Sequence, residues 1–179
     1  VHKPVLLKEV GEYLDPKPGD NFIDATLDGG GHAMALAEKV APDGKVLGIE
    51  WDSDLAAEAK RNINISKYRD NIIVVNDSYV NIEKIVREYN FRPKGILFDL
   101  GLSSWHYERS GRGFSFKRDE PLDMRFDTDS SLTAAEVVNM YSEEELERIL
   151  REYGEEQFSK QIAENIISAR RREPILKTS

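Results

Sequence analysis

The sequence predicts an α/β fold, with a parallel β-sheet in the first hundred residues and helices toward the carboxyl end. Between residues 20 and 99, four short runs rich in β-branched residues alternate with stretches in which apolar residues recur every three or four positions. Strands and helices that alternate in this way form βαβ units with right-handed crossovers. We therefore expect a doubly wound, Rossmann-like sheet of four strands in the order 3-2-1-4.

The individual elements follow from the same periodicity. Strands are expected at residues 21–25, 45–51, 71–76 and 95–99, and the intervening helices at 33–40, 53–63 and 81–89. An amphipathic helix precedes the first strand and ends before Pro16. Residues 100–125 lack periodicity and are expected to form a long loop, whose aromatic content disfavours disorder. Helices are expected from residue 131, after a capping box that begins at Ser142, and from about residue 155 to 172.

Composition excludes several classes of protein. The chain has no run of eighteen apolar residues, and its first residues lack the basic-then-apolar pattern of a signal peptide, so a soluble, cytoplasmic protein without a membrane partner is expected. Cysteine is absent, which excludes a disulfide framework and thiolate metal sites. The three histidines, His2, His32 and His106, are too far apart in sequence to indicate a metal cluster. No metal is expected.

The net charge of −8 is unevenly distributed. Residues 126–156 carry ten acids and two bases, so the rest of the chain is neutral. Within that remainder, five bases gather in the long loop: Arg109, Arg112, Lys117, Arg118 and Arg125. Such a cluster is either solvated surface or a contact surface for nucleic-acid phosphates.

A glycine-rich turn leaves the first predicted strand and enters a helix. The turn contains Gly29, Gly30 and Gly31, which let the backbone pass close beneath a ligand. The next strand ends at Glu50, twenty-six residues after Asp24, where a carboxylate can accept hydrogen bonds from a ribose diol. The alternative for Glu50 is a solvated strand end.

Acids beside the glycine turn distinguish between the two common cofactors that contain ribose. Asp24 and Asp28 would repel the pyrophosphate of a dinucleotide, but would attract the ammonium and sulfonium of S-adenosylmethionine. Tyr79, after the third strand, offers a ring at the expected adenine position, with ordinary packing as the alternative. A nicotinamide-dependent dehydrogenase is therefore disfavoured, and S-adenosylmethionine is the expected cofactor.

Several motifs then occur in order along the chain. They are residues 2–7 (HKPVLL), Gly30-Gly31-His32, residues 99–104 (DLGLSS), 112–116 (RGFSF), 121–125 (PLDMR) and 153–156 (YGEE). Together they resemble the MraW/RsmH family of ribosomal RNA small-subunit methyltransferases, which methylate the N4 amine of a cytosine in 16S ribosomal RNA. The resemblance covers the whole chain.

The resemblance implies a methyltransferase fold into which a helical substrate domain is inserted after the fourth strand, giving domains at residues 1–125 and 126–179. It implies cofactor contacts at Gly30, Gly31, His32, Glu50, Tyr79, Asp99 and His106. Asp28 stands where the family usually has glycine, Glu50 where it has aspartate, and His106 where glutamine is common. Relatives continue for over a hundred residues, so this chain is expected to be an amino-terminal part, with a strand edge open to self-association.

The expected reaction is methyl transfer to a cytosine amine. Acceptors that hold the amine N–H groups would turn its lone pair toward the methyl group, and the candidates are Asp99, Ser103 or the backbone carbonyls of residues 99–104. An alternative is that Asp99 only binds the cofactor. Aromatic side chains could hold a flipped base, namely Trp105, Tyr107, Phe114 and Phe116, although a hydrophobic cluster is the favoured interpretation of the two phenylalanines.

The basic loop would then contact the partner, 16S ribosomal RNA or the small ribosomal subunit, through Arg109, Arg112, Lys117, Arg118 and Arg125, with Trp105 beside them. Arg125 could instead pair with Asp123 or Asp127. Two further interpretations remain, namely a methyltransferase for a protein or small molecule and a non-catalytic fragment that binds the cofactor.

Overall fold

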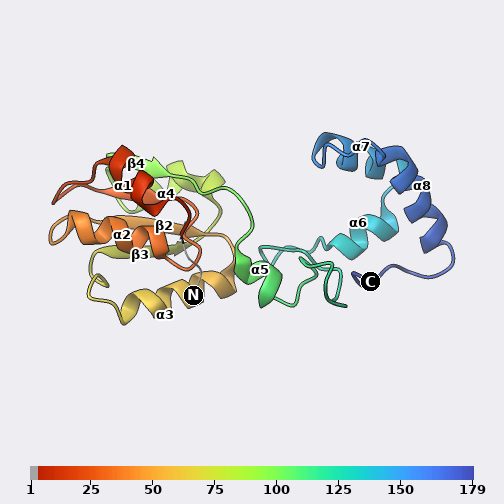
Figure 1. The fold of residues 1–179 in the computed structure, drawn as a ribbon, viewed down its shortest axis with the longest axis horizontal. Helices are drawn as coiled ribbons and strands as arrows, with labels where there is room; N and C mark the ends of the chain where they lie inside the picture. The colour runs from red at the N-terminus through yellow and green to blue at the C-terminus, as the bar shows by residue number, and fades with distance from the viewer. Residues whose placement is uncertain (1–3) are drawn as a thin grey trace. The chain divides into compact units, whose positions relative to one another are not determined.

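A computed structural model describes residues 4–179 of the chain, so His2 and Lys3 of the first motif lie outside the described residues. The chain forms two compact units, one ending at Ser103 and one beginning at Ser104 (Figure 1). By packing, residues 104–125 therefore group with the helices that follow them. The functional domain boundary expected after residue 125 stays a prediction. No helix in the described part of the chain is long and apolar enough to cross a membrane.

The first unit is a parallel sheet with helices between its strands. Its strands are β1 (Phe22–Asp24), β2 (Val46–Glu50), β3 (Ile72–Asn76) and β4 (Gly95–Leu97), and they lie in the order β3-β2-β1-β4. Its helices are α1 (Leu7–Leu14), α2 (Gly31–Val40), α3 (Ser53–Asn64), the short 3-10 helix η1 (Tyr79–Asn81) and α4 (Ile82–Glu88). All three strand pairings are parallel, so the predicted strand order and sheet type are confirmed.

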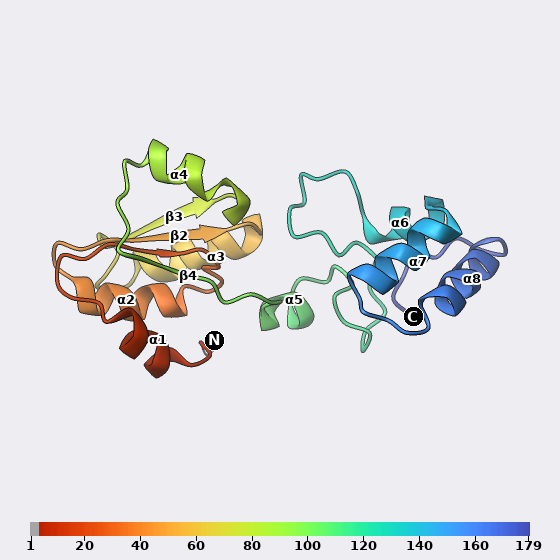
Figure 2. The same ribbon diagram turned by 90° about the horizontal axis from the view of Figure 1, so that it is seen from above.

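Two apolar clusters fix the helices to opposite faces of this sheet. On one face, Phe22 and Val46 pack with residues of α2 and α3. On the other, Ile23 and Leu47 pack with Ile85 of α4, and Figure 2 shows α4 on the side of the sheet opposite α1 and α2. Neighbouring strand residues point to opposite faces, so a continuous apolar run is what a sheet covered on both sides requires.

Strand β4 is shorter than predicted, because the residues that follow it leave the sheet and serve the site. The strand expected through Asp99 ends at Leu97, whose carbonyl accepts from the Ala25 N–H at 2.9 Å. Beyond it the backbone leaves the ladder, and the Asp99 N–H donates to the Thr26 hydroxyl at 2.7 Å. A side chain thus replaces a strand partner for this N–H.

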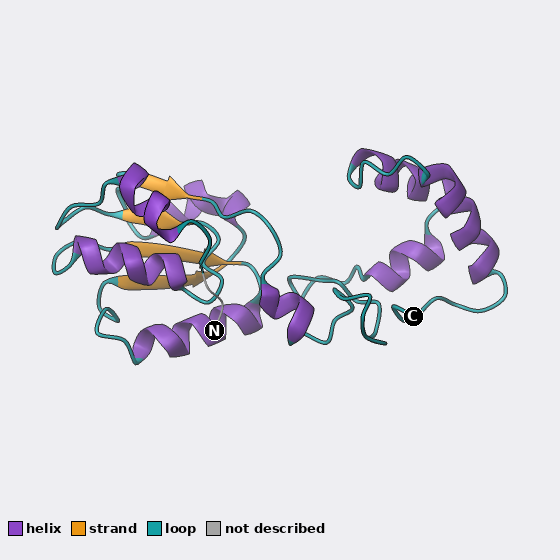
Figure 3. Cartoon of the chain, viewed as in Figure 1, coloured by secondary structure: helices purple, strands orange, loops and turns teal. Residues whose placement is uncertain are grey.

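The second unit consists of helices and a long loop (Figure 3). Its helices are α5 (Ser104–Glu108), α6 (Ala134–Met140), α7 (Glu143–Glu152) and α8 (Ser159–Arg170). The capping box predicted at Ser142 is confirmed, and a second one joins Thr133 to Glu136. The short helix α5 was not predicted, because five residues are too few to show a period.

The last described residues close the loop of the second unit. Lys177 forms an antiparallel bridge with Pro121, and the Thr178 hydroxyl accepts from the Glu120 N–H at 3.1 Å. The Lys177 ammonium also pairs with Asp119 at 2.6 Å. Residues 177 and 178 therefore hold residues 119–121 of the loop in place.

An apolar strip follows β4. Ile96 is 43% exposed, Phe98 46% and Leu100 69%, and β4 pairs with no strand other than β1 among the described residues. An unpaired strand beside exposed apolar side chains favours association with another chain.

We expect the 179-residue chain to self-associate with rising concentration, and Ile96→Lys to restore a monomer in analytical ultracentrifugation. Ile65→Lys, at an 89% exposed isoleucine away from the sheet, is the matched control. A wild-type chain that stays monomeric up to ten times the working concentration would contradict this expectation.

Candidate functional site in the first unit and a basic loop in the second

The carboxyl ends of the parallel strands place several acids at one edge of the sheet. Asp24 ends β1, Glu50 ends β2 and Asp99 follows β4. Parallel strands bring such residues together, and ligands of doubly wound folds bind at this edge. The structure therefore gathers the acids that the sequence singled out.

Asp24 is fully buried and only partly bonded. One carboxyl oxygen accepts a long hydrogen bond of 3.4 Å from the Thr26 N–H. The other, Oδ2, has no hydrogen-bond partner among residues 4–179. Burial raises the pKa of Asp24 to about 8, and the nearby charges of Glu50 and Asp99 act in the same direction. At neutral pH and without a ligand the carboxyl is thus mostly protonated, and it would ionise beside a cation.

The Glu50 carboxylate connects the loop after β1 to the loop after β2, a contact that the sequence did not predict. Its Oε2 accepts from the Asp28 N–H and its Oε1 from the Asp52 N–H, both at 2.9 Å. The side chain is buried rather than a solvated strand end. Burial raises the pKa of Glu50 above its ordinary value, although these two backbone N–H groups oppose the shift. A carboxylate has about four acceptor positions, so two bonds leave capacity for a ligand.

The glycine turn has a backbone that explains its composition. Gly30 adopts a φ of +84° and caps the amino end of α2. At Gly31 a Cβ would lie 2.2 Å from Pro4, so only glycine lets the amino-terminal segment pass so close. Asp28 also lies in the left-handed region, at a φ of +48°, a conformation that glycine adopts without strain. Its carboxylate accepts from the Ser103 hydroxyl at 2.7 Å.

His32 lies between the amino-terminal segment and Asp99. Its Nε2 is 2.8 Å from the Val5 carbonyl, which can only accept, so Nε2 carries a proton. Its Nδ1 lies 4.0 Å from Asp99 Oδ2. In the neutral ring Nδ1 therefore presents a lone pair toward the Asp99 side.

The remaining predicted site residues of the first unit differ in how far they are exposed to solvent and in whether they already form a hydrogen bond. Tyr79 is 40% exposed and meets Phe98 edge-on, with 5.7 Å between ring centroids, so part of its ring stays available to a ligand. Ser103 is buried by its bond to Asp28, which favours Asp99 over Ser103 as the acceptor that faces a substrate. A Cβ at Gly29 would meet no atom within 4 Å, so the turn is open at that point.

Two residues of the site were missed by sequence reasoning. Thr26 holds the Asp99 backbone and also contacts Asp24, but a threonine after a strand carries no distinctive pattern. Asp52 is fully buried and caps α3, accepting from the N–H groups of Asp54 and Leu55. An aspartate just before a predicted helix was a signal that could have found it.

His106 and Trp105 belong to an aromatic cluster of the second unit. His106 is 3% exposed and meets Phe114 and Phe126 edge-on, at centroid distances of 5.1 and 4.8 Å. The Arg112 guanidinium lies 5.3 Å from the centre of the Trp105 ring. A cofactor role for His106 stays a prediction.

The basic residues of the loop divide into buried and exposed ones. Arg112 is buried and donates to the carbonyls of Arg125 and Phe126, so its contacts are those of a structural residue. Arg125 binds both carboxylate oxygens of Asp123, at 2.8 and 2.7 Å, which favours the ion-pair alternative. The exposed bases are Arg109, Lys117 and Arg118. Contacts with RNA are therefore better supported for these three.

The two phenylalanines of the loop differ. Phe114 is 8% exposed and packs against Phe126, in agreement with the predicted hydrophobic cluster. For Phe116 that prediction is wrong, because its ring is 89% exposed. The backbone turn at Gly113, with a φ of +78°, lets alternate residues of this segment leave the cluster.

Comparison with known proteins identifies the relatives of this chain. The model of the MraW methylase family matches residues 1–179. Ribosomal RNA small subunit methyltransferase H of Dictyoglomus thermophilum is 44% identical over 96% of this chain and 58% of its own length. The protein of the same name from Syntrophotalea carbinolica is 42% identical over 99% of this chain and 56% of its own.

Among solved structures, a proposed rRNA methylase from Clostridium thermocellum aligns with 57% of this chain and 54% of its own, with a TM-score of 0.49 and 23% identity. The chain spans a little over half the length of the curated relatives it matches. On the strength of the family match over all its residues, the chain belongs to the MraW methylase family.

Proposed function

We propose that this chain carries the cofactor site of an S-adenosylmethionine-dependent methyltransferase that acts in the cytoplasm on small-subunit ribosomal RNA, at the N4 amine of a cytosine. The relatives' names support the ribosomal RNA substrate. The cytosine amine and the 16S molecule follow from the motif resemblance. Residues 126–179 would begin the substrate domain.

The observation that carries the proposal is the buried Asp24 oxygen without a partner. A buried acceptor left unbonded costs free energy unless a ligand satisfies it. Asp24, Glu50 and Asp99 lie at one sheet edge, and the charges of the last two raise the pKa of Asp24. Three acids fit a ligand that carries a sulfonium and an ammonium, and they disfavour a pyrophosphate. The residues present therefore fit S-adenosylmethionine.

The other predicted cofactor residues fit the same ligand. Glu50 retains acceptor positions for ribose hydroxyls, and Tyr79 exposes part of its ring for an adenine. Gly29, Gly30 and Gly31 form the turn beneath, at the start of α2.

The chain's own part in the reaction is to orient the amine and receive its proton. S-adenosylmethionine supplies an activated methyl group, so no covalent intermediate with the protein is needed. The Asp99 carboxylate, with its backbone fixed by Thr26, would accept an N–H of the amine and turn the lone pair toward the methyl group. His32 Nδ1 lies on the Asp99 side and is suited to accept that proton next.

Two measurements test this function. Calorimetry should detect binding of S-adenosylmethionine but not of NADH. Incubation with methyl-labelled S-adenosylmethionine and small ribosomal subunits should place label in 16S ribosomal RNA, recovered after nuclease digestion as N4-methylcytidine. Label in ribosomal protein alone would contradict the RNA substrate. Binding without any transfer would favour the alternative of a cofactor-binding chain without catalysis.

A further inference from the structure

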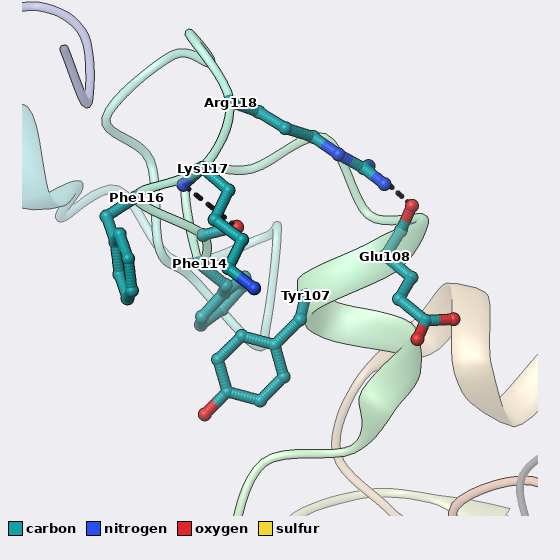
Figure 4. Close-up of a pocket in the computed structure, with 7 residues that line it drawn as sticks. Tyr107, Glu108, Phe114, Phe116, Lys117 and Arg118 are labelled. Atoms are coloured by element: carbon teal, nitrogen blue, oxygen red, sulfur yellow. Dashed lines mark hydrogen bonds between the residues drawn. The ribbon is translucent and has the colours of Figure 1, made fainter.

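A cavity of about 400 Å³ opens between α5 and the loop that follows it, within the second unit. Its walls include Tyr107, Phe114, Phe116, Lys117 and Arg118. Figure 4 shows the rings of Tyr107 and Phe116 on either side of Phe114, with the end of Lys117 reaching toward Tyr107 and Phe114. The volume lies in the range of pockets that bind small organic groups.

The walls of this cavity are held by hydrogen bonds and ring contacts within the second unit. The Arg118 guanidinium donates to the Glu108 carbonyl at 2.5 Å, which ties the loop to the end of α5. The Gly113 N–H donates to the buried Glu120 carboxylate at 3.0 Å, and a Cβ at Gly113 would lie 2.4 Å from the Pro121 carbonyl. Phe114, at the floor, packs against His106 and Phe126. The cavity is thus a formed feature of the loop.

Two aromatic rings and one ammonium group of this cavity are exposed to solvent. Phe116 is 89% exposed and Tyr107 43% exposed, and no ring contact is found for either within residues 4–179. No ion pair holds the Lys117 ammonium in the described part of the chain, whereas Arg118 pairs with Glu120 at 3.6 Å. Figure 4 shows the Glu108 carboxylate directed away from the rings. Two available aromatic faces therefore lie beside one available cation.

We propose that this cavity binds an unpaired base of single-stranded RNA, which stacks on Phe116 and Tyr107 while an adjoining phosphate contacts Lys117. Base stacking on aromatic side chains combined with a basic contact to the backbone is the common way to bind single strands. The proposal rests on the proposed RNA substrate and identifies a base subsite for it. An apolar peptide would use the rings but would give no reason for the ammonium.

The test uses a fluorescein-labelled decamer of cytidine ribonucleotides and fluorescence polarisation on the full chain. Phe116→Leu should weaken binding by about 5-fold to 100-fold, since stacking is worth about 1–3 kcal/mol per base. Phe116→Tyr keeps a ring and should bind within about twofold of wild type. Phe158→Leu, at a 66% exposed phenylalanine of the same unit outside the cavity, is the matched control and should change nothing.

Lys117→Gln tests the phosphate contact separately. A lost phosphate contact lowers the slope of log affinity against log salt by about 0.7 for a single strand. Equal affinities for Phe116→Leu and Phe158→Leu, or a salt slope unchanged by Lys117→Gln, would overturn the proposal. Failure of the wild-type chain to bind the decamer would overturn it as well. So would a Phe116→Leu variant that binds the decamer normally and is altered only in its binding to proteins.

The test of the base subsite can be distinguished from the test of the proposed function. Phe116→Leu should leave the calorimetric affinity for S-adenosylmethionine unchanged, because Phe116 lines the loop cavity and is not one of the residues proposed to hold the cofactor. In a preparation that transfers methyl groups, Phe116→Leu should raise KM for RNA and leave kcat unchanged. Loss of cofactor binding by the wild-type chain would instead count against the proposed function while the decamer results stood.

Discussion

Asp24→Asn is expected to stabilise the empty protein by about 2 kcal/mol at pH 8 and to weaken S-adenosylmethionine binding by about 10-fold to 100-fold. The gain arises because the unfolded chain has released the Asp24 proton at this pH while burial favours the protonated form in the folded chain, a penalty that asparagine does not have. The loss arises because a charged acceptor contributes about 1.5–3 kcal/mol to a hydrogen bond. A variant that is more stable and yet binds less would identify Asp24 as a binding residue that the fold does not need.

The stabilisation should depend on pH in a defined direction. The folded-state pKa of Asp24 is raised to about 8, from 3.8 for an ordinary aspartate. The unfolded chain therefore loses this proton first as pH rises, and the contribution of Asp24 to stability decreases between about pH 4 and pH 8. Urea denaturation at pH 5 and pH 8.5 should show the advantage of Asp24→Asn growing with pH. Asp43→Asn, at an exposed position, should show no such trend.

The affinity for the cofactor should also depend on whether Asp24 is protonated. A cation beside Asp24 favours the carboxylate, so S-adenosylmethionine should displace a proton and bind more tightly from pH 6 to pH 8. Calorimetry in two buffers of different ionisation enthalpy measures this release directly. An affinity that does not change with pH, in both wild type and Asp24→Asn, would exclude Asp24 from the site.

Glu50→Ala is expected to cost about 3 kcal/mol of stability in addition to cofactor affinity. Its carboxylate accepts from two backbone N–H groups, those of Asp28 and Asp52, and both would lose a charged acceptor. Glu50→Gln keeps one acceptor oxygen, so about half of the stability should return while binding stays weak. Denaturation curves and calorimetry on the same samples separate the two effects.

The control for Glu50 is Glu38→Ala. Glu38 forms only an exposed ion pair with Lys67, at 3.9 Å, and such pairs contribute little. Full stability of Glu50→Ala would show that the two loops do not depend on the Glu50 carboxylate.

Much of the fold was predictable because its signals are local. A buried parallel sheet needs apolar runs such as residues 46–49, and helices such as α3 need apolar residues at helical spacing, so both appear in the sequence as patterns. The strand order followed from the same alternation. The acids at the strand ends could also be found, because parallel strands align their carboxyl ends.

The partners of those acids could not be predicted. The contacts of Glu50 with Asp28 and of Val5 with His32 join residues 22 and 27 positions apart, and no periodicity encodes them. The same holds for Arg112, which was expected at the surface. Its burial depends on carbonyls 13 and 14 residues further along the chain. Residue type predicted what these side chains can do, but only the fold decides what they contact.

The closing contacts of the second unit also constrain the order in which the chain can fold during synthesis. The four described strands of the first unit end by Leu97, so they can pair while later residues are still being added. The aromatic and basic loop, by contrast, depends on Lys177 and Thr178, which lie 58 residues beyond Asp119 and Glu120. Loop-closure entropy opposes these contacts until the end of the segment has emerged from the ribosome. A nascent chain stopped near residue 150 should therefore have protected amide hydrogens in the first unit and an unprotected, protease-sensitive loop at residues 109–125.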